Sequence, residues 1–161
     1  MKLVPLEKLF TVKYGNQFDL YQLDNDDGHI DFVSRGEKDN GVSSKVKTFK
    51  GNEPFQAGLI TVALGGSVLA SFVQINNFYT GQNVKVLSPK REMNLLEKLY
   101  YCMAIKHNRF RYSALGREAN KTLKDILIPE FMPEELKVID MEKLDTLVTS
   151  INFEFKRVKD I

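Results

Sequence analysis

The stretch LITVALGGSVLASFVQ, residues 59–74, decides how the chain folds, because two apolar segments flank a short turn in it. LITVAL (59–64) is apolar and β-branched, as a buried strand is, and GGS (65–67) interrupts it. VLASFVQ (68–74) is long enough to return beside the first segment. The stretch therefore predicts a β-hairpin.

Shorter strands are predicted on both sides of this hairpin. HIDFVS (29–34) lies between the turn signals NDDGH (25–29) and KDNG (38–41), where Asn and Gly tolerate positive φ. NVKVL (83–87) alternates apolar and charged residues, which predicts a half-exposed strand. DILIP (125–129) predicts a short strand that Pro129 stops.

Two helices accompany the strands. PLEKLF (5–10) is a short helical start with Pro5 where its missing N–H is tolerated, and the clearest helix is expected over 95–107. Asn94 can cap that helix, and Glu97 completes a capping-box-like pattern. Its predicted buried face consists of Leu96, Leu99, Tyr100, Met103 and Ala104. The fold class is therefore α/β (α+β): a compact, mixed, β-rich domain with a capping helix.

The tail carries a separate pattern of apolar residues at spacings of three and four. These residues are Met141, Leu144, Val148, Ile151, Phe155 and Val158. Such a seam suits either the packing of one helix on another or an amphipathic helix on its own core. We accordingly expect a domain over 1–132 and a C-terminal helical tail over 133–161, a possible connector or dimerisation segment.

Length and composition set the general class. The 161 residues fit one domain, or one domain with an appendage, and 43% hydrophobic content is enough for an ordinary core. No run of about 18 uncharged apolar residues exists, so no membrane-spanning helix is expected. Pro5 and Glu7 interrupt the apolar segment that a signal peptide needs. The lone Cys102 excludes an internal disulfide, which favours a cytoplasmic location.

The net charge of +2 hides an uneven distribution. Residues 16–31 hold five Asp and no base, and residues 125–161 hold nine acids against five bases. Residues 85–124 hold ten bases against three acids. A basic block between acidic flanks suggests one face suited to a polyanion, although charges also decorate ordinary solvated faces.

Signatures of catalysis are mostly missing. Gly-rich phosphate loops and a methyltransferase-type tetrapeptide are absent, and two distant histidines with one cysteine give too few zinc ligands. Cys102, inside the apolar helix, is interpreted as a core thiol. Asp125, Glu135 and Lys137 could form a nuclease-like Mg²⁺ site, but PEELK is also an ordinary helix start after Pro133. We expect no enzyme and no cofactor.

Three polar loops carry a binding signature instead. Residues 109–124 combine long cations with amide side chains, SRGEKDNGVSSKVK (34–47) does the same, and QINNFYTGQNVK (74–85) is rich in amides. Lys and Arg neutralise phosphates, while Arg, Asn and Gln match the edges of guanine and adenine. Solvent exposure explains any one loop; three loops of similar chemistry favour recognition of double-stranded DNA.

Five segments in order strengthen this interpretation: PLEKLFTVKYG (5–15), IDFVSRGEKDNGV (30–42), FQAGLITVALGGS (55–67), FYTGQNVKVLSPK (78–90) and FRYSALGREANKTLKDILIP (110–129). Together they resemble the target recognition domain of type I restriction-modification specificity subunits and related type IIB systems, over roughly residues 1–130. The resemblance implies a non-catalytic domain whose loops enter the major groove and read half of a split target.

The resemblance also implies site residues. It places Ser34, Arg35, Asn40, Gln82, Tyr112, Arg117, Asn120 and Lys121 on the side that faces DNA. The basic residues Lys45, Lys47, Arg109 and Arg111 are added as candidate DNA contacts, mostly with phosphates. The acidic flanks are expected to face away from DNA or toward partners, and Gly65 and Gly66 to shape the hairpin turn.

The chain departs from a full specificity subunit, which has two recognition domains. It could be a half-subunit that pairs through its tail, with methyltransferase and restriction subunits as partners. Alternatively, it could be a stand-alone domain that acts as a protein-interaction or anti-restriction factor.

Overall fold

The computed structural model describes residues 1–113 and 119–137. The chain divides into two compact units, Met1–Glu130 and Phe131–Ile161. The predicted boundary between residues 132 and 133 stays a prediction, and the apolar seam over 141–158 lies outside the described residues.

A four-stranded antiparallel sheet forms the centre of the first unit, in the order β2-β8-β5-β6. Its strands are β2 (Phe10–Tyr14), β8 (Val84–Pro89), β5 (Ile60–Ala63) and β6 (Ser71–Val73). Ile60 pairs with Val73 and Val62 with Ser71. The predicted hairpin over 59–74 is therefore confirmed.

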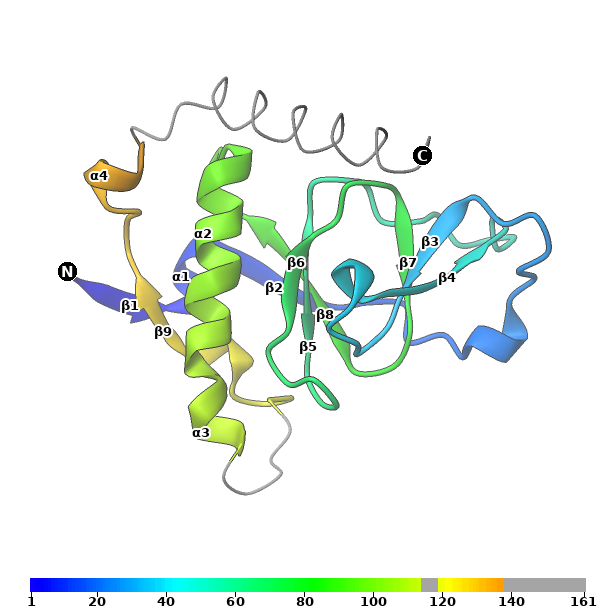
Figure 1. Cartoon of the computed structure of the whole chain (residues 1–161), viewed down its shortest axis with the longest axis horizontal. Coiled ribbons are helices and arrows are strands. Elements are labelled where there is room, and N and C mark those ends of the chain that lie inside the picture. Colours follow the sequence, from blue (N-terminus) through cyan, green and yellow to red (C-terminus); the bar gives the residue numbers. More distant parts are fainter. Residues whose placement is uncertain (114–118, 138–161) are drawn as a thin grey trace, which may run out of the picture. The chain divides into compact units, whose positions relative to one another are not determined.

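A three-stranded sheet in the order β4-β3-β7 lies beside it (Figure 1). It consists of β3 (Ile30–Val33), β4 (Val42–Val46) and β7 (Phe78–Thr80), with β3 antiparallel to β4 and parallel to β7. The HIDFVS strand is confirmed. A pair of short strands, β1 (Leu3–Pro5) and β9 (Leu127–Pro129), forms a third sheet, so the DILIP strand is confirmed as well.

The helices of the first unit are α1 (Leu6–Leu9), α2 (Leu95–Lys106) and α3 (Phe110–Ser113), with 3₁₀ turns η1 (Leu20–Gln22), η2 (Asp39–Gly41), η3 (His107–Arg109) and η4 (Leu123–Asp125). Helix α2 packs against β6 and β9 (Figure 1). In the second unit, α4 (Glu134–Lys137) carries an ion pair between Lys137 and Glu134. No described helix is long and apolar enough to cross a bilayer.

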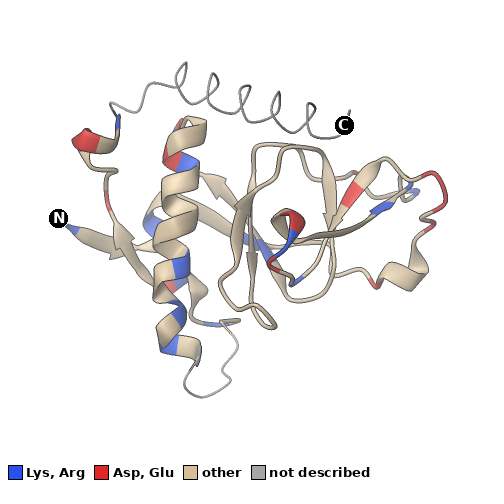
Figure 2. Cartoon of the chain, viewed as in Figure 1, with Lys and Arg blue, Asp and Glu red and all other residues tan. Residues whose placement is uncertain are grey.

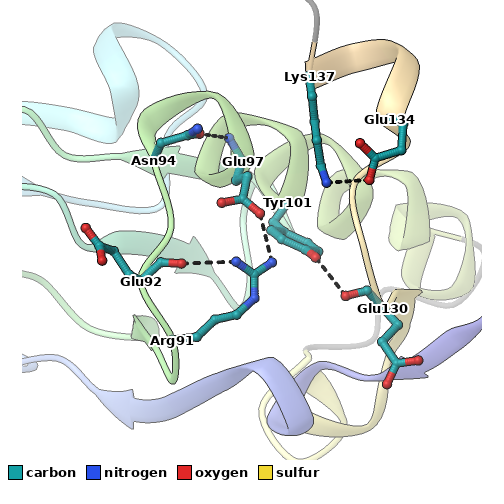
Figure 3. A network of polar contacts seen from close by, with 8 residues as sticks. All are labelled: Arg91, Glu92, Asn94, Glu97, Tyr101, Glu130, Glu134 and Lys137. Atoms are coloured by element: carbon teal, nitrogen blue, oxygen red, sulfur yellow. Dashed lines mark hydrogen bonds and ion pairs between the residues drawn. The ribbon is translucent and has the colours of Figure 1, made fainter.

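The start of α2 is fixed by polar contacts, drawn in Figure 3. The Asn94 side chain accepts a hydrogen bond of 2.9 Å from the Glu97 backbone N–H, as a helix N-cap does. The Glu97 carboxylate lies 2.8 Å from Arg91, and the Tyr101 hydroxyl donates to the Glu130 carbonyl oxygen at 3.1 Å. The predicted helix and its cap are confirmed.

The buried face of α2 differs from the predicted one. Tyr101, Cys102 and Ile105 are buried, whereas Leu99 and Met103 are 40% and 63% exposed. Tyr100 and Ala104 pack only partly against the core. The correction has a simple reason: apolar residues occur almost all round this helix, so their spacing did not single out one face.

Strand β8 is more deeply buried than the half-exposed strand predicted for 83–87. Val84 and Val86 belong to one apolar cluster and Leu87 to another, so both faces of the strand are covered. Its central place between β2 and β5 explains this, because both neighbouring strands shield it. Lys85 is partly buried, and its ammonium lies 3.5 Å from the centre of the Tyr14 ring.

The described residues of the first unit form three apolar clusters. The largest includes Leu6, Phe10, Ile60, Leu87 and Tyr101, and so joins α1, the four-stranded sheet and α2. The other two pack on the two faces of the smaller sheet. Cys102 belongs to the largest cluster, where burial raises the pKa of its thiol to about 12, so its interpretation as a core thiol is confirmed.

Candidate functional site

Four segments of the first unit meet around the backbone of Leu64, at the end of β5. The Leu64 N–H donates to the Asn83 carbonyl at 2.9 Å, and the Leu64 carbonyl accepts from the Ala119 N–H at 2.9 Å. The Ser67 N–H donates to the Arg35 carbonyl at 3.1 Å. Main-chain hydrogen bonds therefore join residues 34–41, 64–69, 81–83 and 119–121, which we call the loop cluster.

The hairpin turn within this cluster depends on Gly66. Its φ is +64°, a conformation that favours glycine, and a Cβ there would lie 3.3 Å from the Arg35 Cβ and carbonyl oxygen. Gly65 does not share the positive φ. Gly66 thus allows the turn to approach residue 35 closely, and Leu69, with φ of 59°, completes the reversal.

Loop 34–41 is held at both of its ends. The Ser34 N–H donates to the Gly41 carbonyl at 2.8 Å, which closes the loop over η2. Gln74, 1% exposed, donates its side-chain amide to the Asn40 carbonyl at 2.9 Å and to the Thr61 hydroxyl at 2.7 Å. Asn40 has φ of 55°, so the loop is a well-defined turn with its backbone anchored on the larger sheet.

The structure brings together half of the predicted site residues. Ser34, Arg35, Asn40, Gln82, Asn120 and Lys121 all belong to the loop cluster. The side chains of Arg35, Asn40, Gln82 and Lys121 are exposed, and Gln82 donates to an Asp19 carboxylate oxygen at 3.3 Å. Arg117 lies outside the described residues. The cluster combines guanidinium, amide and ammonium groups, the chemistry that reads base edges and phosphates.

Two predicted residues contact protein rather than solvent. Arg109 donates from Nε to the Val68 carbonyl at 2.8 Å and lies 2.7 Å from the Glu37 carboxylate. Tyr112 is 7% exposed, and its hydroxyl lies 2.8 Å from the Thr122 hydroxyl. These contacts support structural roles for both side chains. Arg111, which follows Arg109 in the chain by two residues, is exposed.

Lys45 and Lys47 lie on or next to β4 and pair with acidic side chains. Lys45 contacts Asp31 at 2.6 Å, and Asp31 is only 4% exposed. Lys47 contacts Asp24 at 2.9 Å, and this hydrogen bond lowers the pKa of the Asp24 carboxyl. Figure 2 shows blue and red positions close together around β3 and β4. Part of the acidic segment 16–31 therefore lies beside the predicted cations, not away from them.

Several cations of the basic segment 85–124 also contact other groups of the protein. Lys90 donates to the Glu7 carbonyl at 2.6 Å, Lys98 to the Gly58 carbonyl at 2.8 Å, and Lys106 pairs with Glu37 at 3.0 Å. Within residues 1–113 and 119–137, several exposed cations have no ion pair: Arg35, Lys38, Arg111, Lys121 and Lys124. These cations remain available to a polyanion.

The nuclease-like hypothesis gains no support from the structure. Asp125 lies in η4 of the first unit, and Glu135 and Lys137 in α4 of the second. Among the described residues, no group of three or more His, Cys, Asp or Glu could hold a metal ion.

Comparison with known proteins decides the family. Residues 1–160 match the family described as type I restriction modification DNA specificity domain. The chain belongs to this family. The resemblance inferred from five motifs over residues 1–130 is thereby confirmed, and the match extends into the tail. Specificity subunits are the non-catalytic components of these systems, which agrees with the prediction that the chain is not an enzyme.

Solved structures share the fold. The specificity subunit from M. genitalium is 19% identical with a TM-score of 0.66, over 96% of this chain and 42% of that one. A chain from a study of complex assembly in the type I system is 17% identical with a TM-score of 0.66, over 98% and 40%. The HsdS subunit from Thermoanaerobacter tengcongensis is 16% identical with a TM-score of 0.63, over 98% and 39%.

The chain thus spans about two fifths of the subunits that it resembles. No curated protein gives a significant match. The family match identifies a specificity domain of a type I restriction-modification system, which implies recognition of a DNA target.

Sequence reasoning missed three residues that organise the site. Gln74 holds the Asn40 carbonyl, Asp31 holds Lys45 and also accepts from Asn76 at 3.0 Å, and Glu37 binds two cations. The sequence held one indication of these roles: Glu37 and Asp31 lie within or next to basic loops, where an acidic side chain is expected to pair with a cation.

Proposed function

We propose that this chain reads one half of a split target in double-stranded DNA, as the single-domain specificity component of a type I restriction-modification system. The observation that supports this proposal most is the loop cluster, in which main-chain hydrogen bonds of Leu64, Ser67 and Ala119 bring together polar loops from distant parts of the sequence. The family match over residues 1–160 supports DNA target recognition by this domain.

The exposed amide and guanidinium groups of the cluster are the proposed base readers. Arg35 can form paired hydrogen bonds with guanine, and Asn40 and Gln82 have the donor and acceptor pair that matches adenine. Asn120 has the same pair but is only partly exposed. Arg117, outside the described residues, joins this set on the resemblance alone.

Phosphate contacts are assigned to two exposed cations, Lys121 in the cluster and Arg111 in α3. Arg111 and Lys121 carry no ion pair with any described residue. Lys45 and Lys47 contribute less, because Asp31 and Asp24 compensate their charges. Arg109 and Tyr112 are left out of the contact set because both are engaged with protein groups.

The partners follow from the family. Methyltransferase and restriction subunits would act on the DNA that this chain selects, in the cytoplasm where that DNA lies. A pair of chains joined through residues 133–161 would read two inverted half-sites, which is the symmetric form of a split target.

The test is selection from a randomised duplex DNA pool at two salt concentrations, followed by sequencing. Enrichment of one short motif, or of two inverted copies at fixed spacing, would support the proposal. Arg35→Gln should lower the affinity for the enriched motif by about fivefold to a hundredfold, as the loss of one base contact does. Salt-sensitive binding without any enrichment, or no binding at low salt, would refute sequence reading.

A matched pair of variants separates phosphate contacts from general charge. Lys121→Gln in the cluster and Lys13→Gln at an exposed position of β2 each remove one positive charge. If the loop cluster contacts DNA, Lys121→Gln lowers the slope of log affinity against log salt by about one, and Lys13→Gln leaves it unchanged. Equal effects of the two variants would mean that only net charge matters.

The alternative function is that of a protein-interaction or anti-restriction domain. The exposed apolar side chains of Leu95, Leu99 and Met103 along α2 favour it, since apolar helix faces often contact proteins. Methyltransferase binding that survives Arg35→Gln and Arg111→Gln, in a chain that enriches no DNA motif, would support this function over the first.

A further inference from the structure

Glu37 lies in the middle of loop 34–41 and binds two cations, Lys106 at the end of α2 and Arg109 in η3. Its Oε1 atom lies 2.7 Å from Arg109 Nη2 and 3.0 Å from Lys106 Nζ. The Glu37 side chain is 40% exposed, and the Arg109 side chain 29%. One carboxylate oxygen therefore joins the loop to two consecutive turns of the helical segment over 95–109.

Arg109 extends this contact to the hairpin turn. Its Nε atom donates to the Val68 carbonyl at 2.8 Å, while its Nη2 atom holds Glu37. Because the guanidinium is planar and rigid, the hydrogen bond to Val68 and the ion pair with Glu37 have a fixed relative geometry. Hydrogen bonds from Arg109 and then Lys106 lower the pKa of the Glu37 carboxyl, so the group stays ionised at neutral pH.

Two general expectations leave the presence of Glu37 in this loop unexplained. Exposed ion pairs contribute little to global stability, because solvent screens them. A negative charge in a loop that approaches DNA weakens the attraction to phosphates. A contact that adds little stability and opposes non-specific binding is instead suited to fixing where the loop lies.

We propose that Glu37 is a positioning residue: bound by Lys106 and Arg109, it holds loop 34–41 where Arg35 and Asn40 can reach base edges. This inference rests on the proposed function. Glu37 acts through the loop and has no contact with DNA in this account. Recognition geometry tolerates only small displacements, so release of the loop reduces discrimination between sequences more than it reduces overall affinity.

Asp39 provides the matched control. It lies in the same loop, is exposed, and has no ion pair with any residue that the structure describes. Its φ is 49°, a conformation that Asn tolerates well, so Asp39→Asn removes one negative charge without backbone strain. Glu37→Gln removes the same charge from the same loop together with the two ion pairs.

The experiment measures the affinity of the full chain for its enriched motif and for a scrambled duplex, with wild type, E37Q and D39N. Both variants should bind the scrambled duplex slightly more tightly, because each removes one negative charge. The ratio of specific to non-specific affinity should fall at least about fivefold in E37Q, comparable to a lost base contact, and stay unchanged in D39N.

Amide hydrogen exchange provides a readout that does not depend on DNA. The Gly41 N–H, which donates to the Lys38 carbonyl at 2.8 Å, should exchange faster in E37Q than in wild type or D39N. Arg109→Gln should reproduce both effects of E37Q, and the double variant should add little to either single one.

Equal affinity ratios for E37Q and D39N would overturn the proposal, because the effect would then be one of charge alone. Unchanged exchange of Gly41 in E37Q would overturn it as well. If the wild-type chain enriches no motif, the proposed function is wrong, and loop 34–41 then has no role in reading DNA. The exchange data distinguish that case, since they report on the loop whether or not DNA binds.

Discussion

Replacement of Gln74 by methionine tests how the recognition loop is joined to the core. The side chain of Gln74 is 1% exposed and donates two hydrogen bonds, to the Asn40 carbonyl at 2.9 Å and to the Thr61 hydroxyl at 2.7 Å. Methionine has a similar volume and no amide, so Gln74→Met removes both bonds and leaves little or no cavity.

The expected loss of stability follows from what each partner can do afterwards. Thr61 is 2% exposed, so its hydroxyl loses a partner that water cannot replace, at a cost of about 1–3 kcal/mol. Asn40 is exposed, so its carbonyl regains water, and that bond contributes about 0.5 kcal/mol or less. The burial of the apolar methionine side chain offsets part of these two losses. We therefore expect a net destabilisation of about 1–2 kcal/mol.

Urea unfolding of wild type, Gln74→Met, Thr61→Val and the double variant measures this coupling. The double variant should lose less than the two single variants together, because it leaves no unpaired hydroxyl beneath the loop. The Gly41 amide should also exchange faster in Gln74→Met, since the Asn40 carbonyl is no longer held. Additive losses, or a Gln74→Met midpoint equal to that of wild type, would refute the reasoning.

Three further perturbations have defined outcomes. Burial raises the Cys102 thiol pKa from 9.0 to about 12, so alkylation of this thiol at pH 8 should be roughly a thousandfold slower in the folded chain than in urea. The free energy of unfolding should also decline as pH rises from about 9 toward 12, because the thiol ionises more readily in the unfolded chain. Comparable alkylation rates for the folded and unfolded chain, measured by mass spectrometry, would contradict this. Asn94→Ala removes the bond to the Glu97 N–H and should lower stability by about 1 kcal/mol in thermal unfolding, whereas Asn94→Ser should retain most of it. A Cβ at Gly15 would lie 1.9 Å from Thr80 Oγ1, so Gly15→Ala should destabilise the chain by about 1–3 kcal/mol, with a smaller loss in a Thr80→Ala background.

Local features of the fold could be predicted from the sequence. The hairpin over 59–74, the turn at 38–41 and the Asn94 cap each depend on neighbouring residues, and the structure confirms all three. The buried face of α2 could not be predicted, because apolar side chains surround the helix and only its packing against β6 selects Tyr101, Cys102 and Ile105.

Only part of the candidate site could likewise be predicted from the sequence. Its polar loops are visible in the sequence, because their composition is unusual. Which cations remain available could not be predicted, since that depends on partners distant in the chain: Lys106 and Arg109 meet Glu37, and Lys45 meets Asp31. Charge counts along a sequence therefore overstate the basic character of residues 85–124.

The junction at Leu64 has a consequence for engineering. Leu64 forms hydrogen bonds with Asn83 and Ala119, and Ser67 forms one with Arg35; all of them use only peptide N–H and carbonyl groups. The arrangement of these loops therefore does not depend on which side chains they carry, except at positions such as Gly66, where two backbone segments lie too close together for a larger residue. New target sequences could therefore be sought by exchange of loop side chains on an unaltered scaffold, with Glu37 and Gln74 retained as fixed points.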